Sequence, residues 1–417
     1  MTSVALPRQP VQYYSSGLRG RFQVDAHRAV AAPPAEGYAD IDYEFDEAKY
    51  AARTESVLRA GGLEKELPSG FPASLSGQMV WSGADLSESD YVLQLSEVCK
   101  AEIMDALQHF LSLGLDGTEV GMATFPLPTL GPQLERAKQD VYDGRGFVII
   151  RGLDVDLFSD EDLVIVYLGV TSYIAEKRGK QNQRGDMLVH VLNATEDDAT
   201  ANKSVEKPFH TDTVCDVLCL LTKACANVGG RSIMSSAWNV YNELAATRPD
   251  IIHTLLRPNW PFDTNGRDPP YYNRAILYYE NQKMIWNFSR RLLTGAAPKD
   301  PRTLNIPGLT ARQAEALDAV HAIARSHEVR TVMQKGDIRI LNNMGILHRR
   351  ESFEDDETSK RHLIRLWAHN EEYCWKLPVP LRLAWARVFE DDERETHWAL
   401  SPVGLNGKIL RQAVSCD

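Results

Sequence analysis

The stretch KPFHTDTVCDVLCLLTKA, residues 207–224, places two potential metal ligands directly before a run of apolar residues. Because Pro208 disfavours helical backbone in the residue before it, the approach to this pair is expected to be extended. Side chains alternate between faces in extended backbone, so His210 and Asp212 are predicted to point the same way. The β-rich run that follows, Val217–Ala224, is predicted to form a buried strand.

A third potential ligand lies far downstream, in the stretch GDIRILNNMGILH, residues 336–348. Turn residues at both ends bound a predicted strand, 337–342, and His348 follows it. Among the eleven histidines, only His210 is followed two positions later by an aspartate. Two imidazoles and one carboxylate on one face of a metal leave other positions open, which is typical of non-haem Fe(II) oxygenases. His210, Asp212 and His348 are therefore the predicted metal ligands.

The nature of the metal is not decided by the ligands alone, because this set suits several divalent ions. Structural zinc favours four protein ligands, and zinc hydrolases with two histidines usually carry H-E-x-x-H, which this sequence lacks. An oxygen-activating enzyme is the leading interpretation. Two alternatives stay open: a zinc-dependent hydrolase, which would act without O₂, and a non-catalytic jelly-roll binding protein whose metal is structural or absent.

Two arginines lie on one predicted strand, RHLIRLW at residues 361–367. Arg361 and Arg365 are four positions apart and share a face. The planar fork of a guanidinium matches a carboxylate, and burying two such groups without anions is costly. If this face points inward, the strand needs two anions, or one anion and an acidic neighbour. The alternative is an exposed face with surface ion pairs.

The order of the predicted elements favours an α+β fold. Residues 1–75 read as an N-terminal arm with a short helical piece near 46–60, and residues 76–417 as one domain. Helices dominate the first part of that domain, and strands with short turns dominate after about residue 185. This order predicts a β-sandwich or jelly roll buttressed by helices. The predicted helices are 87–113, 130–142, the one opened by residues 159–162, 237–248 and 310–328. The predicted strands are 146–153, 187–192, 217–224, 231–236, 275–279, 283–287, 337–342 and 363–369.

The composition is that of an ordinary globular protein, with 417 residues, 43% hydrophobic and 25% charged. A net charge of −11 and a pI of about 5.5 argue against nucleic acid or an anionic membrane as a partner. The six cysteines form no C-x-x-C pair, so a disulfide scaffold and a zinc ribbon are not expected. With no secretory signal or long apolar run, the chain is expected to be cytoplasmic.

Together these residues resemble the taurine dioxygenase/TfdA-type family of Fe(II)- and 2-oxoglutarate-dependent dioxygenases. The similarity spans roughly residues 67–380. It includes MVW at 79–81, FPLP at 125–128 and GRGF at 144–147, in the style of fungal members. The resemblance implies a double-stranded β-helix, or jelly-roll, core with N-terminal and inserted helices around it.

The resemblance also implies a role for each site residue. His210, Asp212 and His348 match the iron ligands of the family. Arg361 matches the arginine that binds the distal carboxylate of 2-oxoglutarate. The stretch GGRS at 229–232 resembles a G-G-x-T motif whose hydroxyl contacts the same co-substrate, with Ser232 in place of threonine. Arg365 stands where a second arginine holds an anionic group of the substrate in some members.

The implied reaction oxidises an unactivated C–H bond with Fe(II), 2-oxoglutarate and O₂, releasing succinate and CO₂. Hydroxylation is the default outcome, while desaturation or oxidative cyclisation needs the same ligands. The expected partner is a small anionic molecule of the carboxylate or amino-acid type, in a reaction of secondary metabolism. A homo-oligomer stays open.

Overall fold

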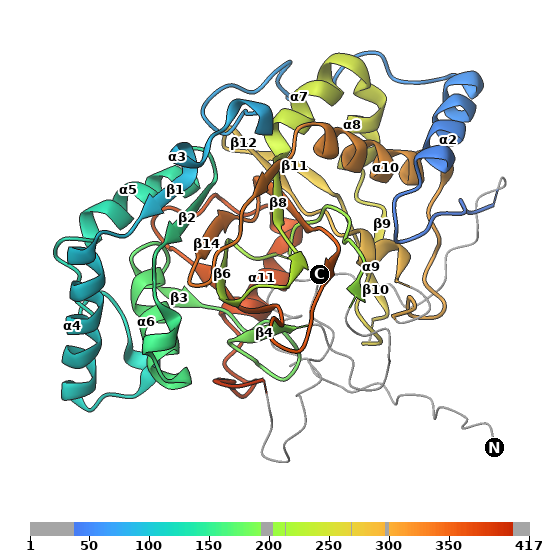
Figure 1. Cartoon of the computed structure of the whole chain (residues 1–417). Coiled ribbons are helices and arrows are strands. Elements are labelled where there is room, and N and C mark those ends of the chain that lie inside the picture. The colour runs from blue at the N-terminus through green and yellow to red at the C-terminus, as the bar shows by residue number, and fades with distance from the viewer. Residues whose placement is uncertain (1–36, 193–202, 213, 268, 297–299, 403–417) are drawn as a thin grey trace, which may run out of the picture.

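The structure, a computed structural model, describes residues 37–192, 203–212, 214–267, 269–296 and 300–402 (Figure 1). The helices are α2 (Glu47–Ala60), α3 (Glu88–Tyr91), α4 (Glu97–Leu113), α5 (Gly131–Tyr142), α6 (Asp160–Ser172), α7 (Ala237–Thr247), α8 (Pro249–Leu256), α9 (Arg290–Thr294), α10 (Ala311–Ser326) and α11 (Arg382–Phe389). The strands are β1 (Val92–Gln94), β2 (Phe147–Arg151), β3 (Lys177–Arg178), β4 (Val189–Leu192), β5 (Lys203–Ser204), β6 (Val217–Ala224), β7 (Val228–Gly229), β8 (Ser232–Ser236), β9 (Trp260–Asp263), β10 (Tyr271–Arg274), β11 (Leu277–Glu280), β12 (Lys283–Trp286), β13 (Val329–Thr331), β14 (Ile338–Asn342), β15 (Ile346–Arg350), β16 (Phe353–Glu354) and β17 (His362–His369).

Two sheets form the jelly-roll core. The large sheet runs β1-β2-β14-β6-β17-β3, with β4 also paired to β17, and the smaller sheet runs β13-β8-β15. All of these pairs are antiparallel except that of β1 with β2. Most strands that pair are distant in sequence, as β14 is from both of its neighbours. The fold is thus the predicted jelly roll within a mixed α and β architecture.

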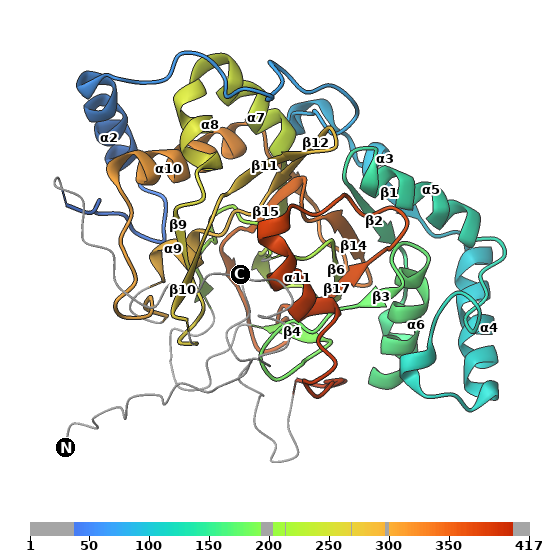
Figure 2. The same ribbon diagram turned by 180° about the vertical axis from the view of Figure 1, so that it is seen from behind.

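Two groups of helices flank the core on opposite sides (Figures 1 and 2). α4, α5 and α6 lie together, with α5 in contact with β2 and β14 of the large sheet. α7, α8 and α10 make up the second group, in which α7 and α10 contact β8 of the smaller sheet. Serine and threonine side chains cap the first turns, as Ser159 does for α6 and Thr310 for α10.

One face of the large sheet is directed at the smaller sheet. Directly paired residues of neighbouring strands share a face, and Arg365 pairs with Leu220, which also pairs with Arg339. The guanidinium of Arg365 lies 3.1 Å (Nη1–Oδ2) from the carboxylate of Asp212, so this row faces the interior. Arg361, four residues before Arg365, is also buried. The inward alternative for the arginine strand is the one that the structure adopts.

Most predicted elements are present, and three differ in an informative way. The predicted helix from Ser87 is interrupted, because residues Val92–Gln94 pair with β2 as β1 and a new helix starts after Ser96. Pro249 ends α7 as expected but also begins α8, since proline suits the first turn of a helix. His348 lies within a further strand, β15, rather than after one.

Residues 37–75 pack against the body of the protein through helix α2, which was predicted. Arg53 of α2 forms an ion pair with Asp318 of α10, and Arg290 donates a hydrogen bond from Nε to the carbonyl of Asp42 at 2.9 Å. Several apolar side chains of this stretch, among them Tyr50 and Phe71, contact the hydrophobic core. In the described part of the chain, every helix is too short or too polar to cross a membrane.

Candidate active site

The three predicted ligands meet inside the jelly roll. The Nε2 atoms of His210 and His348 lie 3.8 and 3.5 Å from Oδ1 of Asp212, and one donor atom from each residue lies within 4.8 Å of the others. All three side chains are buried. Donor atoms about 2.1 Å from one ion are separated by at most about 4.2 Å, so both carboxylate–imidazole distances suit a shared metal.

Backbone pairing brings the two histidines together. His210 and His348 form an isolated antiparallel bridge, with N–H···O distances of 3.0 and 2.9 Å in the two directions. Their imidazole rings lie 4.4 Å apart between centroids. The segment that carries His210 thus extends the edge of the smaller sheet beside β15. This pairing explains how ligands from remote parts of the sequence become neighbours.

Hydrogen bonds fix the orientation of the ligands. Nδ1 of His210 lies 3.0 Å from the carbonyl oxygen of Pro208, which requires a proton on Nδ1 and leaves the Nε2 lone pair for a metal. Asp212 receives a hydrogen bond on Oδ2 from Trp367 Nε1 at 2.6 Å and an ion pair from Arg365 on the same oxygen. These contacts occupy Oδ2 and direct Oδ1 at both histidines, as one-oxygen ligation of a metal needs.

Asn343 fixes the backbone of the ligand pair. Its Oδ1 accepts the N–H of Asp212 at 2.8 Å, and its Nδ2 donates to the carbonyls of Asp212 and Cys215 at 2.8 and 3.0 Å. The following turn is strained, since Val214 has a φ of 45° that β-branched residues rarely adopt. Asn343, a turn residue at the end of the predicted strand 337–342, therefore also fixes the backbone of the segment that carries His210 and Asp212.

Arg365 on β17 and Arg361, directly before β17, have different surroundings. Arg365 is held by Asp212 and, through Nε, by Gln181 Oε1 at 2.8 Å. Arg361 donates from Nε to the carbonyl of Gly230 at 3.2 Å, and its guanidinium lies over the ring of Phe353. Burial lowers the pKa of Arg361 to about 9, helped by the nearby charges of two other arginines, so it remains a cation at neutral pH.

Gly230 makes room for Arg361. A Cβ atom at Gly230 would lie 3.0 Å from Cδ and 3.1 Å from Nε of Arg361, and the φ of Gly230 is 75°. A side chain there would displace the guanidinium and strain the backbone. Ser232, two residues later, is buried at the start of β8. The GGRS motif thus places a tight turn against Arg361, followed by a strand that begins with the buried hydroxyl of Ser232.

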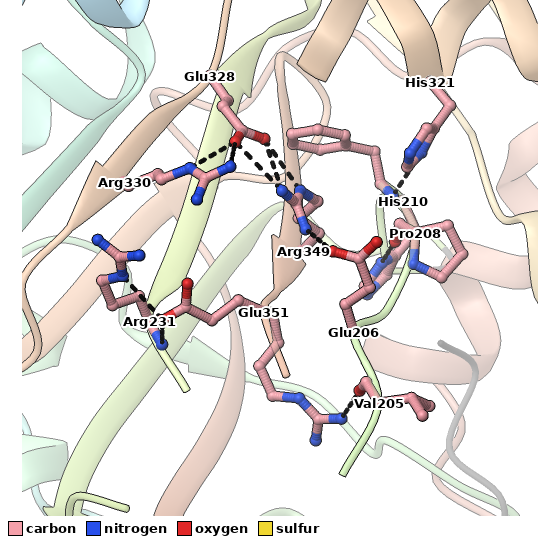
Figure 3. A network of polar contacts seen from close by, with 12 residues as sticks. Val205, Glu206, Pro208, His210, Arg231, His321, Glu328, Arg330, Arg349 and Glu351 are labelled. Carbon is pink, nitrogen blue, oxygen red and sulfur yellow. Dashed lines mark hydrogen bonds and ion pairs between the residues drawn. The ribbon is translucent and has the colours of Figure 1, made fainter. Parts of the chain in front are cut away.

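A network of ion pairs lies behind the predicted metal ligands, on the other side of β15 (Figure 3). Arg349, which follows His348, donates to Glu328 at 3.0 and 3.1 Å and to Glu206 at 3.0 Å. Its guanidinium also lies 5.3 Å from the ring centroid of Phe209, the residue before His210. Arg349 thereby ties the His210 segment to β15 and to the end of α10.

His321 on α10 also contacts the segment that carries His210, at the backbone of Phe209. Its Nδ1 accepts the backbone N–H of Phe209 at 3.3 Å (Figure 3). Burial lowers the pKa of His321 to about 3, and the nearby arginines Arg290, Arg349 and Arg325 lower it further in the same direction. The ring is therefore neutral at physiological pH, which its role as a hydrogen-bond acceptor requires.

Several residues around the site were not singled out from the sequence. Trp367 shares a face with Arg361 and Arg365 by strand alternation, but nothing in the sequence indicated its bond to Asp212. Arg349 follows a ligand directly, and its side chain points away from the metal because neighbours on a strand alternate. Arg339 is a charged residue in the otherwise apolar run IRIL of β14. That single charge was the available signal, and it marks an arginine in the interior.

The fold and the site define a class of enzyme. A jelly roll that buries two histidines and one carboxylate, with an arginine-lined interior beside them, is the architecture of non-haem iron oxygenases. The chain matches the model of the taurine catabolism dioxygenase TauD, TfdA family over residues 111–367. It belongs to this family, and it is an Fe(II)- and 2-oxoglutarate-dependent dioxygenase that uses O₂.

Two relatives match over most of their length. A taurine hydroxylase-like protein, SAT17, of Stachybotrys chartarum is 33% identical over 366 residues, which cover 84% of this chain and 94% of the relative. FR-33289 synthase of Streptomyces rubellomurinus is 27% identical over 318 residues, covering 71% of this chain and 91% of the relative.

Solved structures share the fold at low sequence identity. An asparagine oxygenase in complex with Fe(II), 3-hydroxyasparagine and succinate aligns with a TM-score of 0.52 and 15% identity, over 67% of this chain and 93% of that one. The non-heme iron oxygenase OrfP in complex with iron aligns with a TM-score of 0.50 and 14% identity, over 67% and 94% of the two chains. These similarities support the jelly-roll assignment.

Proposed function

We propose that His210, Asp212 and His348 hold the Fe(II) ion of this dioxygenase. The observation that carries the proposal is the convergence of two Nε2 atoms on one carboxylate oxygen in a buried site. His210 is fixed in the tautomer that presents Nε2, and Asp212 has its second oxygen committed to Trp367 and Arg365. The donor set leaves positions open on the metal, as a co-substrate and O₂ require.

Arg361 and Ser232 are proposed to bind the distal carboxylate of 2-oxoglutarate. Arg361 is a buried cation whose guanidinium has, among the described residues, one hydrogen-bonded partner, the carbonyl of Gly230. Arg365, four residues along the same face, reaches the metal ligand Asp212. Four residues of strand span about 13 Å, which leaves room for a five-carbon dicarboxylate between the two positions. Of the two anions that the arginine strand needs, Asp212 supplies one and the co-substrate would supply the other.

The substrate is proposed to be a small molecule of the amino-acid or carboxylate type. The relatives support this class, since one is described as taurine hydroxylase-like and a fold neighbour holds 3-hydroxyasparagine. Arg365 is our candidate for an anionic group of the substrate. Such a group would have to share the guanidinium with Asp212 and Gln181, which would couple substrate binding to the position of the ligand carboxylate.

When bound, iron, 2-oxoglutarate and O₂ would supply the oxidising power: the co-substrate would become succinate and CO₂, and one oxygen atom would enter the substrate C–H bond to give an alcohol. The chain's own contribution is to orient and to exclude water. Trp367 and Arg365 hold Asp212, the pairing of His210 with His348 fixes both imidazoles, and the buried interior keeps water from the site.

The wider organisation is also proposed. We assign residues 76–417 to one catalytic domain and residues 1–75 to an N-terminal arm. We further propose that the protein works in the cytoplasm, where the buried thiols Cys215 and Cys219 stay reduced. A homo-oligomer is compatible with this function but not required by it.

The decisive experiment adds Fe(II) and then 2-oxoglutarate to the apo-protein without oxygen. A weak visible charge-transfer band is expected, and His210→Ala should lose it. A variant at the exposed His109, His109→Ala, is the control and should keep the band. A wild-type protein that binds zinc but gives no band with Fe(II) and 2-oxoglutarate would contradict the assignment. Succinate release in a screen of amino acids and small organic acids would then identify the substrate.

A further inference from the structure

Arg339 is a fully buried cation in the middle of the large sheet. It lies on β14, between β2 and β6, with 1% of its surface exposed. Its Nε and Nη1 atoms are buried and have no hydrogen-bond acceptor among the described residues, and its Nη2 is 3.5 Å from Thr222 Oγ1. An unsatisfied buried guanidinium costs several kcal/mol in stability, so its presence calls for a bound acceptor.

The side chain of Arg339 is directed toward Arg361 rather than toward the metal. Arg339 and Arg365 both pair with Leu220, so their backbones lie in one row across the sheet. The Nη2 atom of Arg339, however, approaches Thr222, and Thr222 pairs with Leu363, which is two residues nearer to Arg361 along β17. After burial and the charge of Arg350, the positive charge of Arg339 further lowers the pKa of Arg361, in keeping with this direction. Two cations therefore approach one another at one end of the interior.

The neighbouring carboxylates are committed elsewhere. Both oxygens of Asp337 accept hydrogen bonds from Arg151, at 3.0 Å each, and one of them also accepts the N–H of Gln334. Asp355 accepts the backbone N–H of Arg361 at 2.9 Å. Among the described residues, neither carboxylate accepts a hydrogen bond from the guanidinium of Arg339 or Arg361. Asp337 and Asp355 raise the pKa of Arg339 and Arg361, respectively, through space, but neither carboxylate supplies the missing hydrogen-bond acceptors.

We infer that Arg339 is a second guanidinium for the distal carboxylate of 2-oxoglutarate, which the chain holds between Arg361 and Arg339. The inference rests on the proposed binding of that carboxylate by Arg361 and adds a residue to it. A carboxylate has two oxygens and can accept from two guanidinium groups at once. Arg339 would thereby favour 2-oxo acids that carry a distal charge over those that do not.

The test compares two 2-oxo acids that differ in the distal carboxylate. Fe(II)-loaded full-length protein is titrated without oxygen with 2-oxoglutarate and with 2-oxopentanoate, which has the same chain length but an uncharged end. Arg339→Met is expected to weaken 2-oxoglutarate binding by about 10- to 100-fold and to leave 2-oxopentanoate binding within about twofold. Lys335→Met, which removes an exposed positive charge close to β14, is the matched control and should change neither.

A second measurement guards against a folding effect. Because Nε and Nη1 of Arg339 lack an acceptor among the described residues, Arg339→Met should melt at the same temperature as the wild type or higher without ligand, and 2-oxoglutarate should raise its melting temperature less. Arg339→Lys keeps the charge without the fork and should lose less affinity than Arg339→Met. If 2-oxopentanoate binds too weakly to titrate, the 2-oxoglutarate affinity and these melting temperatures decide.

Three results would overturn the inference. These are an unchanged 2-oxoglutarate affinity in Arg339→Met, an equal loss for both 2-oxo acids, and a melting temperature that falls while ligand stabilisation is preserved. The last two would make Arg339 a structural residue. Failure of the proposed function looks different, because the wild-type protein itself would then show no 2-oxoglutarate-dependent band.

Discussion

Two buried arginines, one on each sheet of the jelly roll, have contrasting partners. Arg349 on β15 is 4% exposed and donates three hydrogen bonds to Glu328 and Glu206. Arg339 on β14 is 1% exposed, and two of its nitrogens have no acceptor among the described residues. Arg339 is the one charge in the apolar run IRIL, whereas Arg349 stands between His348 and Arg350. Both side chains are buried, yet one is satisfied by the protein and the other is not.

The difference separates structural from ligand-binding charge. A buried cation with acidic partners holds elements together, and its removal leaves those partners uncompensated. A buried cation without a hydrogen-bonded carboxylate destabilises the empty protein and gains that partner on binding, so its removal should harm binding and spare stability. Arg361 falls in the second group with Arg339, whereas Arg365 is paired with Asp212 and belongs with the structural charges unless a substrate competes for it.

The largest expected effect is on co-substrate binding when Arg361 is removed. Arg361→Met should weaken 2-oxoglutarate binding by about 1000-fold, which corresponds to about 4 kcal/mol, because a charged and buried hydrogen-bonded pair is lost. Anaerobic titration of the Fe(II) protein measures it. The melting temperature of the apo-protein should not fall. A drop in stability with little change in affinity would instead show that Arg361, like Arg349, is a structural charge.

The converse experiment removes Arg349. Arg349→Met should lower the free energy of unfolding by about 3 kcal/mol, since the buried Glu328 loses a partner and the exposed Glu206 loses a second, weaker contact. Urea unfolding of the apo-protein, followed by tryptophan fluorescence, measures this loss. Fe(II) affinity should also fall by about 10-fold, because the strand that carries His348 is less well fixed.

A double variant sharpens that result. Arg349→Met combined with Glu328→Gln should cost less than the two single changes together, because the second substitution removes the uncompensated charge. Strict additivity would show that the ion pair between these residues contributes little. The Arg330 side chain, which also pairs with Glu328, would then be the more important partner.

The sequence was sufficient to predict that His210 and Asp212 lie on one side of the chain, because the signals for this are local. The extended approach after Pro208 and the two-residue period put His210 and Asp212 on one side, and these side chains do meet His348. The family motif supplied the remaining partner. Strand 217–224 was likewise predicted with its exact bounds from a short apolar run.

What the sequence could not supply depends on pairing between distant strands. Val92–Gln94 read as part of a helix, because its parallel contact with β2 is not visible in a local pattern. Arg339 was included in a predicted strand, but its inward direction follows from its pairing with Leu220 of β6. Whether a buried arginine finds hydrogen-bond acceptors depends on side chains from several elements. The contrast between Arg339 and Arg349 therefore appears only in the three-dimensional structure.

The smallest expected effect tests the neutral histidine behind the metal site. The pKa of His321 is lowered to about 3 in the folded protein, against about 6.5 in the unfolded chain. Between these values the unfolded chain binds a proton that the folded protein does not, so stability falls as the pH drops below about 6.5. At pH 5 this group should have removed about 2 kcal/mol of the stability present at neutral pH.

His321→Gln should flatten this part of the pH profile, because glutamine offers an oxygen to the N–H of Phe209 without taking up a proton. The difference in unfolding free energy between the variant and the wild type should shift by about 2 kcal/mol in favour of the variant from pH 7 to pH 5. His109→Gln, at an exposed position on α4, is the control and should follow the wild type. Parallel profiles for His321→Gln and the wild type would mean that the ring is protonated in the folded protein. His321 would then be a further cation beside Arg349, and the two glutamates would balance more charge than the hydrogen bonds imply.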